Sequence, residues 1–206
     1  MKNTILIVLL LSTFFGLAQG LEDTHIERLK EKYNQENTLK CQILVSIDVE
    51  GMRIPDKEVY VEFSEGGKPI VKGKGLSLLP KRGTLEQFRE LLSTPLQAIF
   101  LSKKGNNMVY KLVSLDPSSD WITADIVFDP EKYLIYESVV NTKTHGSFNT
   151  INEYDDQIYP SLTVVTFEAK KFKLPLKFIG SQQNADPKAK IDDNTRGKVV
   201  LRYSYL

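Results

Sequence analysis

Hydrophobic and polar residues alternate along much of this chain, most clearly between Trp121 and Ala169. In two segments of that stretch every second residue is apolar, which is the period of a strand with one buried face. Short turns at Asp129-Pro130, His145-Gly146 and Asp155-Asp156 separate the segments, so successive strands are placed to pair antiparallel. The pattern predicts a β-meander. The residues expected on its buried face are Ile122, Ala124, Ile126, Phe128, Val165, Phe167 and Ala169.

The same period predicts further strands on either side of the meander. The longest starts at Leu39, and after a turn over 51–56 the next strand ends at Phe63, where Gly66-Gly67 closes a hairpin. A weaker strand and an apolar loop follow over 68–83. Residues 96–101 and 108–115 predict another hairpin, 181–197 an exposed loop, and the last ten residues a final strand. The apolar positions of these strands include Cys41, Ile43, Val45, Ile47, Val49, Val59, Val61, Phe63, Val199, Leu201, Tyr203 and Tyr205.

Two segments have the helical period instead. Thr24 and Glu27 form a capping-box pattern ahead of an apolar stripe at Ile26, Leu29 and Tyr33, which predicts a helix from about Thr24 to Gln35. Thr84 and Gln87 repeat the pattern, and Pro95 ends the second helix. Its apolar stripe consists of Leu85, Phe88, Leu91 and Leu92. Helices this short are marginal alone, so both are expected to dock on the sheet.

Together the elements predict a mainly β (α+β) fold, in which a curved antiparallel sheet forms an incomplete β-barrel covered by short amphipathic helices. A single domain over 21–206 accommodates all of them. Residues 1–20 are set apart because a lysine, an apolar run and small residues occur in the order of a signal peptide, which predicts cleavage close to Gly20 and export. No cysteine follows this segment directly, so the mature chain is expected to be soluble rather than lipid-anchored.

The net charge and the candidate catalytic or metal-binding residues limit the classes of function that the chain can have. Without Lys2 the 27 basic and 26 acidic residues become 26 of each, which argues against a nucleic-acid partner. Cys41, the only cysteine, is expected to be a buried structural thiol. His25 and His145 lack metal-ligand spacing and are expected to be solvated surface imidazoles. No familiar catalytic or nucleotide-binding motif occurs, so the sequence predicts a protein that is not an enzyme, with no cofactor and no metal.

The order of the elements also carries a resemblance. A helix leading into a long strand, a turn at Pro55 to Lys57, a mid-chain helix, the segment FDPEKYLIYESVV and a Tyr-Pro-x-Leu strand start at Tyr159 resemble the periplasmic outer-membrane lipoprotein carrier (LolA-like) family, in its Bacteroidetes-type form. The resemblance covers most of the mature chain and implies a half-barrel that holds acyl chains in an apolar cavity beneath a helical lid. It further implies a periplasmic monomer that binds an acylated protein or lipid and exchanges it with membrane-protein donor and acceptor partners.

The residues expected to line this cavity and lid are Ile43, Val45, Ile47, Val61, Phe63, Leu85, Phe88, Leu91, Leu92, Ile126 and Phe128. Alternation alone fits a filled core as well as a hollow one. The alternative is therefore a non-catalytic envelope interaction or sensing module whose β core is filled. An eight-stranded outer-membrane barrel is disfavoured because the two helical segments interrupt the series of strands.

Overall fold

The computed structural model describes residues 23–34, 39–49, 52–63, 70–72, 85–155, 159–168 and 196–206. Several sequence predictions lie outside these residues: the signal peptide over 1–20, the Gly66-Gly67 turn, the Thr84 cap and most of the 181–197 loop. The strands are β1 (Leu39–Val49), β2 (Met52–Arg53), β3 (Lys57–Phe63), β4 (Ile70–Lys72), β5 (Leu96–Lys104), β6 (Asn107–Ser114), β7 (Trp121–Phe128), β8 (Ile135–Thr142), β9 (Ser147–Glu153), β10 (Leu162–Glu168) and β11 (Arg196–Tyr205).

All of the strands belong to one antiparallel sheet of eleven strands. Its order is β4-β3-β1-β11-β10-β9-β8-β7-β6-β5, with β2 paired to the end of β1. The predicted meander is confirmed as the consecutive run from β7 to β10. Strand β11 lies inside the sheet, between β1 and β10. Cys41 on β1 pairs with Tyr205 on β11, so β11 connects the first strand to the end of the meander.

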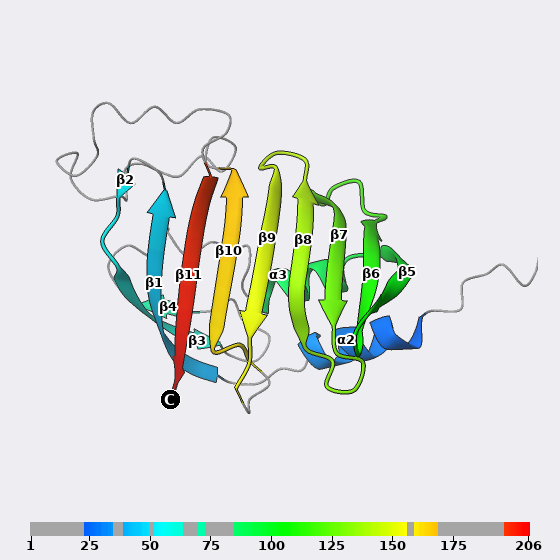
Figure 1. The fold of residues 1–206 in the computed structure, drawn as a ribbon, viewed down its shortest axis with the longest axis horizontal. Coiled ribbons are helices and arrows are strands. Elements are labelled where there is room, and N and C mark those ends of the chain that lie inside the picture. The colour runs from blue at the N-terminus through cyan, green and yellow to red at the C-terminus, as the bar shows by residue number, and fades with distance from the viewer. Residues whose placement is uncertain are drawn as a thin grey trace, which may run out of the picture.

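The sheet is curved (Figure 1). It is also open, because β4 and β5 form its two ends and do not pair with each other. Helices α2 (Thr24–Asn34) and α3 (Leu85–Ser93) lie on the same side, behind the strands in Figure 1. We call the side that carries the helices the inner face and the opposite side the outer face. The predicted fold class, an incomplete antiparallel barrel with short amphipathic helices, is confirmed.

Helix α2 is capped by Asp23 rather than by Thr24. Oδ1 of Asp23 accepts a hydrogen bond from the backbone N–H of His25 at 2.9 Å, and the Asp23 carbonyl accepts from Ile26 and Glu27. The predicted capping box therefore placed the cap one residue too late. The other carboxylate oxygen, Oδ2, accepts a hydrogen bond of 2.6 Å from the Tyr110 hydroxyl on β6, so the cap also ties the helix to the sheet.

Replacing this cap is expected to have a measurable cost. Asp23→Ala removes the N-cap and leaves the Tyr110 hydroxyl, in a buried residue, without its acceptor. We expect a loss of about 2–3 kcal/mol in the free energy of unfolding, measured by urea denaturation. Thr24→Ala, one residue later on the exposed surface, is the control and should change stability by less than about 0.5 kcal/mol. Equal losses in the two variants would restore Thr24 as the cap.

A β-bulge at the start of β7 corrects one predicted core residue. The register between β7 and β8 shifts between Trp121 and Thr123, so the residue that turns inward there is Trp121. Trp121 is 4% exposed, whereas Ile122 is 46% exposed. The prediction that Ile122 lies on the buried face is therefore wrong, because alternation assumes a strand without the extra residue that a bulge inserts.

Two predicted boundaries also differ from the structure, while the hairpin after α3 is confirmed. The segment 51–56, predicted as a turn, contains β2, in which Met52 pairs with Val49. Strand β11 begins at Arg196, inside the segment predicted as a loop. The β5–β6 hairpin turns through Gly105-Asn106, where Gly105 has a φ of 62°, a left-handed conformation that suits glycine.

Candidate ligand-binding face of the sheet

The inner face carries two separate clusters of buried residues. The first, which we call the helix-covered cluster, lies between α2, α3 and strands β6–β8. Both helices contribute to it, and the Phe88 ring of α3 meets the Tyr33 ring of α2 edge-on at 5.8 Å between centroids. Five of the predicted site residues belong to this cluster: Phe88, Leu91, Leu92, Ile126 and Phe128.

The second cluster, which we call the sheet cluster, is built from strands β1, β3 and β9–β11. Four predicted site residues belong to it: Ile43, Val45, Ile47 and Val61. The Phe167 ring lies over Gly197, where an added Cβ would come within 2.3 Å of the ring, so a larger residue would displace Phe167. The two remaining predicted site residues, Phe63 and Leu85, have their backbones in β3 and α3, and their side chains lie outside the described part of the structure.

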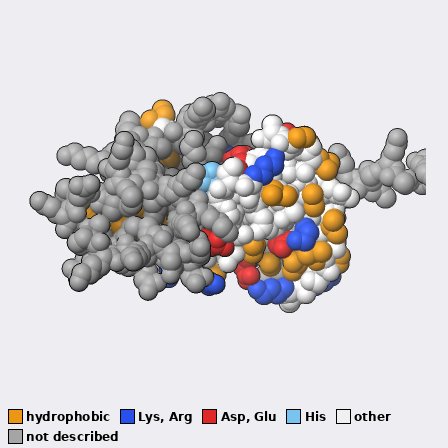
Figure 2. Space-filling model, turned by 90° about the horizontal axis from the view of Figure 1, so that it is seen from above, with side chains coloured by type: hydrophobic (Ala, Val, Ile, Leu, Met, Phe, Trp, Pro, Cys, Tyr) orange, Lys and Arg blue, Asp and Glu red, His pale blue; other side chains and the backbone are white. Residues whose placement is uncertain are grey.

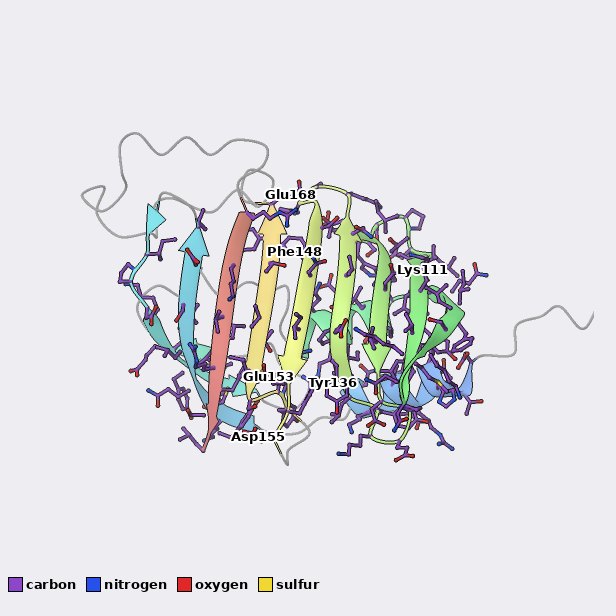
Figure 3. The ribbon with its side chains drawn as sticks, in the orientation of Figure 1. Lys111, Tyr136, Phe148, Glu153, Asp155 and Glu168 are labelled. Atoms are coloured by element: carbon purple, nitrogen blue, oxygen red, sulfur yellow. The ribbon has the colours of Figure 1, made fainter. Side chains whose placement is uncertain are left out.

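Sequence reasoning did not find the inward-facing residues of β9, of which Phe148 belongs to the sheet cluster and two polar residues lie between the clusters. Strand β9 turns Phe148, Thr150 and Asn152 to the inner face, and all three are buried. Figure 3 labels Phe148 on this strand, near the middle of the sheet. Because two of the three inward residues are polar, β9 lacks the apolar alternation that identified its neighbours. A threonine and an asparagine at alternate positions beside a phenylalanine were the available signal.

A chain of hydrogen bonds crosses the inner face at this point. The buried side chain of Asn152 donates to the carbonyl of Ile135 at 2.9 Å and accepts from the Thr163 hydroxyl at 2.8 Å. The Tyr154 hydroxyl donates to the same carbonyl at 2.8 Å, and the Tyr33 hydroxyl accepts from the Ile135 N–H at 3.1 Å. Helix α2 is therefore attached to the sheet at this polar stripe through Tyr33.

Burial raises the pKa of three ionisable groups on the inner face. It raises the pKa of the Tyr33 and Tyr154 phenols above their ordinary value, because the phenolate would lose its hydration. Burial likewise raises the pKa of the Cys41 thiol to about 11. Cys41 has no exposed surface, which confirms the prediction of a buried structural thiol. At neutral pH these groups present hydroxyl and thiol hydrogens rather than charges.

The two histidines are both partly buried and both have neighbours. Nδ1 of His25 lies 3.2 Å from the hydroxyl of Tyr133, in the β7–β8 connection. Nδ1 of His145 lies 3.4 Å from Oδ2 of Asp120. Both rings keep exposed surface, as predicted, and each also contributes to a loop contact that the sequence did not predict. Among the described residues no group of three His, Cys, Asp or Glu side chains is placed to hold a metal ion.

Helix α3 is joined to α2 as well as to the sheet. Nε of Arg89 donates to the carbonyl of Tyr33 at 2.8 Å, and the Ser93 hydroxyl donates to Oδ1 of Asn34 at 3.1 Å. The Tyr33 carbonyl lies in the last turn of α2, where helix carbonyls lack partners within the helix. The two helices thus form one unit, which the contacts of Asp23 and Tyr33 attach to the sheet.

The exposed surface has two features that lie apart from the predicted site residues. Side chains on β5, after β6 and on β7 are between 41% and 59% exposed, and Figure 2 shows hydrophobic groups among charged ones at this end of the sheet. They are Ile99, Phe100, Leu101, Leu115 and Ile122.

The other feature is a pocket of about 550 Å³ beside Glu168, which Figure 3 labels at the upper end of β10. Most of the residues that line it are polar or charged, among them Asp48, Asn149, Arg196 and Lys198.

Comparison with solved structures places the fold. It is similar to a LolA superfamily protein from Nitrosomonas europaea, with a TM-score of 0.50 and 8% identity over 87% of this chain and 91% of that chain. It is also similar to a DUF1329 family protein from Desulfovibrio piger, with a TM-score of 0.49 and 8% identity over 87% of this chain and 88% of that chain. No family model and no curated protein matches the sequence.

At 8% identity the likeness defines the fold and nothing beyond it. The chain has the LolA-like fold, which confirms the resemblance at the level of architecture. Across the described residues, neither helix is long and apolar enough to cross a membrane.

Proposed function

We propose that this protein is an exported, non-enzymatic carrier that binds the acyl chains of lipoproteins or lipids on its inner face and moves them across the periplasm. The observation that carries the proposal is the division of the inner face. Helices α2 and α3 contribute all of their buried apolar residues to the helix-covered cluster and none to the sheet cluster. A LolA-like sheet with this arrangement has a long apolar inner face, of which one half is packed against the described helices and the other half, also buried, is not.

The proposed ligand follows from the chemistry of that surface. Within the described residues the two clusters are lined by aliphatic and aromatic side chains, and no fully buried side chain is charged. Burial of an acyl chain contributes about 0.8 kcal/mol per methylene, so a long chain binds usefully without a charged anchor. The carrier would act as a monomer and exchange its passenger with membrane-protein donor and acceptor partners.

The alternative function is an envelope interaction or sensing module that uses the same sheet with a filled core. The low exposure of both clusters favours it: Leu29, Leu112, Phe128, Phe148 and Leu201 have no exposed surface. Such a module would recognise a partner through its surface and would retain no lipid.

Native mass spectrometry of the purified mature chain, combined with lipid extraction, tests the proposal. A carrier should show an adduct of several hundred daltons or more that disappears on denaturation, and the extract should contain acyl chains. The stripped protein should then bind a fluorescent fatty acid. A chain that shows no adduct, yields no acyl chains and binds no fluorescent fatty acid is not a carrier, and the filled-core module is then preferred.

A further inference from the structure

Two buried hydroxyl groups lie side by side at the boundary between the clusters. Ser138 on β8 and Thr150 on β9 are directly opposite each other in the antiparallel register. They are 2% and 1% exposed, and neither hydroxyl has a hydrogen-bond partner among the residues that the structure describes. Buried polar groups in folded proteins are nearly always paired, because an unpaired one loses its hydration without compensation. This pair therefore requires an explanation.

The protein around the pair offers it no partner in the neighbouring strands. Across the sheet, Ser138 lies opposite Ile126 and Thr150 lies opposite Val165, and neither side chain can form a hydrogen bond. The next polar residue along β9, Asn152, is already paired with Thr163 and the carbonyl of Ile135. The polar stripe is thus satisfied at one end and open at the Ser138–Thr150 pair.

The open groups define the chemistry of an occupant. Each hydroxyl can donate a hydrogen bond, and a carbonyl oxygen has two lone pairs, so one acceptor oxygen can satisfy both hydroxyls. An occupant that presents acceptor oxygens therefore fits the pair. Among the described residues no buried side chain carries a positive charge, which disfavours a carboxylate because an unpaired buried charge is costly. A neutral carbonyl meets both requirements.

The position of the pair fixes what must flank that carbonyl. Ile126 belongs to the helix-covered cluster and Val165 to the sheet cluster, so apolar surface extends from the hydroxyls in both directions. A carbonyl group attached to a long hydrocarbon chain matches this alternation of polar and apolar surface.

We propose that Ser138 and Thr150 form a hydrogen-bonding subsite for the neutral carbonyl oxygens of acyl esters or amides. This inference rests on the proposed function, since it assigns a polar anchor to the same acyl-binding face. The subsite selects acylated molecules over free fatty acids and sets the depth at which the chain sits between the two clusters.

The test compares two ligands that differ in one carbonyl. Displacement of a fluorescent fatty acid gives the Kd of 1-monooleoylglycerol, an ester, and of 1-O-oleylglycerol, the ether that lacks the carbonyl. The parent should bind the ester more tightly. In the Ser138→Ala/Thr150→Val double variant, the affinity for the ester should fall about ten-fold while that for the ether stays unchanged. An N-acyl amide should behave as the ester does.

Controls separate the subsite from packing and from the carrier function itself. Thr150→Ser keeps a hydroxyl and should therefore retain the preference for the ester. The melting temperature of Thr150→Val should equal or exceed that of the parent, because this variant removes an unpaired hydroxyl. Equal losses for ester and ether, no loss for either, or a melting temperature lowered by several degrees would each overturn the subsite. Failure of the parent to bind any acyl ligand would instead overturn the proposed function.

Discussion

Ile43→Asp should lower the free energy of unfolding by about 3–5 kcal/mol, because it buries an unpaired carboxylate in the sheet cluster. Ile43 is 2% exposed and lies at the centre of β1, between Tyr203 on β11 and Val59 on β3. Both neighbouring strands join β1 to the rest of the sheet, so the charge has no edge toward which it can turn. In a domain of this size each kcal/mol shifts the melting temperature by about 2–4 °C, so the loss is easily measured.

The adjacent residue supplies the matched control. Gln42 points to the outer face of the same strand and is exposed, and Gln42→Asp adds the same negative charge one position away. That variant should unfold within about 0.5 kcal/mol of the parent. If Ile43→Asp melts at the parent's temperature, the inner face of β1 is not part of a packed core, and both functions considered for this sheet lose their basis.

The strands that the sequence predicts best are those whose buried residues are all apolar. In β1 the alternation of Cys41, Ile43, Val45, Ile47 and Val49 identifies both the strand and its inward face, and all five are buried. Helix α3 is predicted equally well from the sequence, because its apolar stripe follows the helical period and Pro95 marks its end. Local pattern is sufficient in these elements because every inward position follows a single rule.

Prediction from the sequence failed where an inward position breaks that rule. The bulge beside Trp121 shifts the register by one residue. Strand β9 turns the polar residues Thr150 and Asn152 inward, and the partners of the Asn152 amide come from other segments of the sheet. The cap at Asp23 was missed for a related reason, since its second role is a contact with Tyr110, far away in sequence. Such contacts are set by tertiary structure and leave no periodic signal.

The division of the site into two clusters was also beyond the sequence pattern. Strand β11 pairs with β1 on one side and β10 on the other, a non-local arrangement that places residues 41–49 beside the end of the chain. The predicted residues therefore separate into those beneath the helices and those on the other half of the sheet. Alternation identifies which residues face inward but carries no information on which strands become neighbours.

Phe88→Ala is expected to weaken lipid binding while the fold survives, if the α2–α3 unit closes over a passenger. Phe88 is 3% exposed and contacts Tyr33, so it lies between the two helices and the sheet. In a carrier its ring would contact the passenger as well as the protein. Truncation should then raise the Kd for a fluorescent fatty acid about ten-fold, through the loss of apolar contact area.

The sheet provides the control that separates a lid from ordinary core. Phe128 on β7 has no exposed surface and belongs to the same helix-covered cluster. Phe128→Ala should cost about 3–5 kcal/mol in either kind of core. In a carrier Phe88→Ala should cost clearly less, because a covering helix contributes less to global stability than the strands beneath it. If Phe88→Ala costs as much as Phe128→Ala, and neither the variant nor the parent binds the fatty acid, the core is filled and the helices are structural.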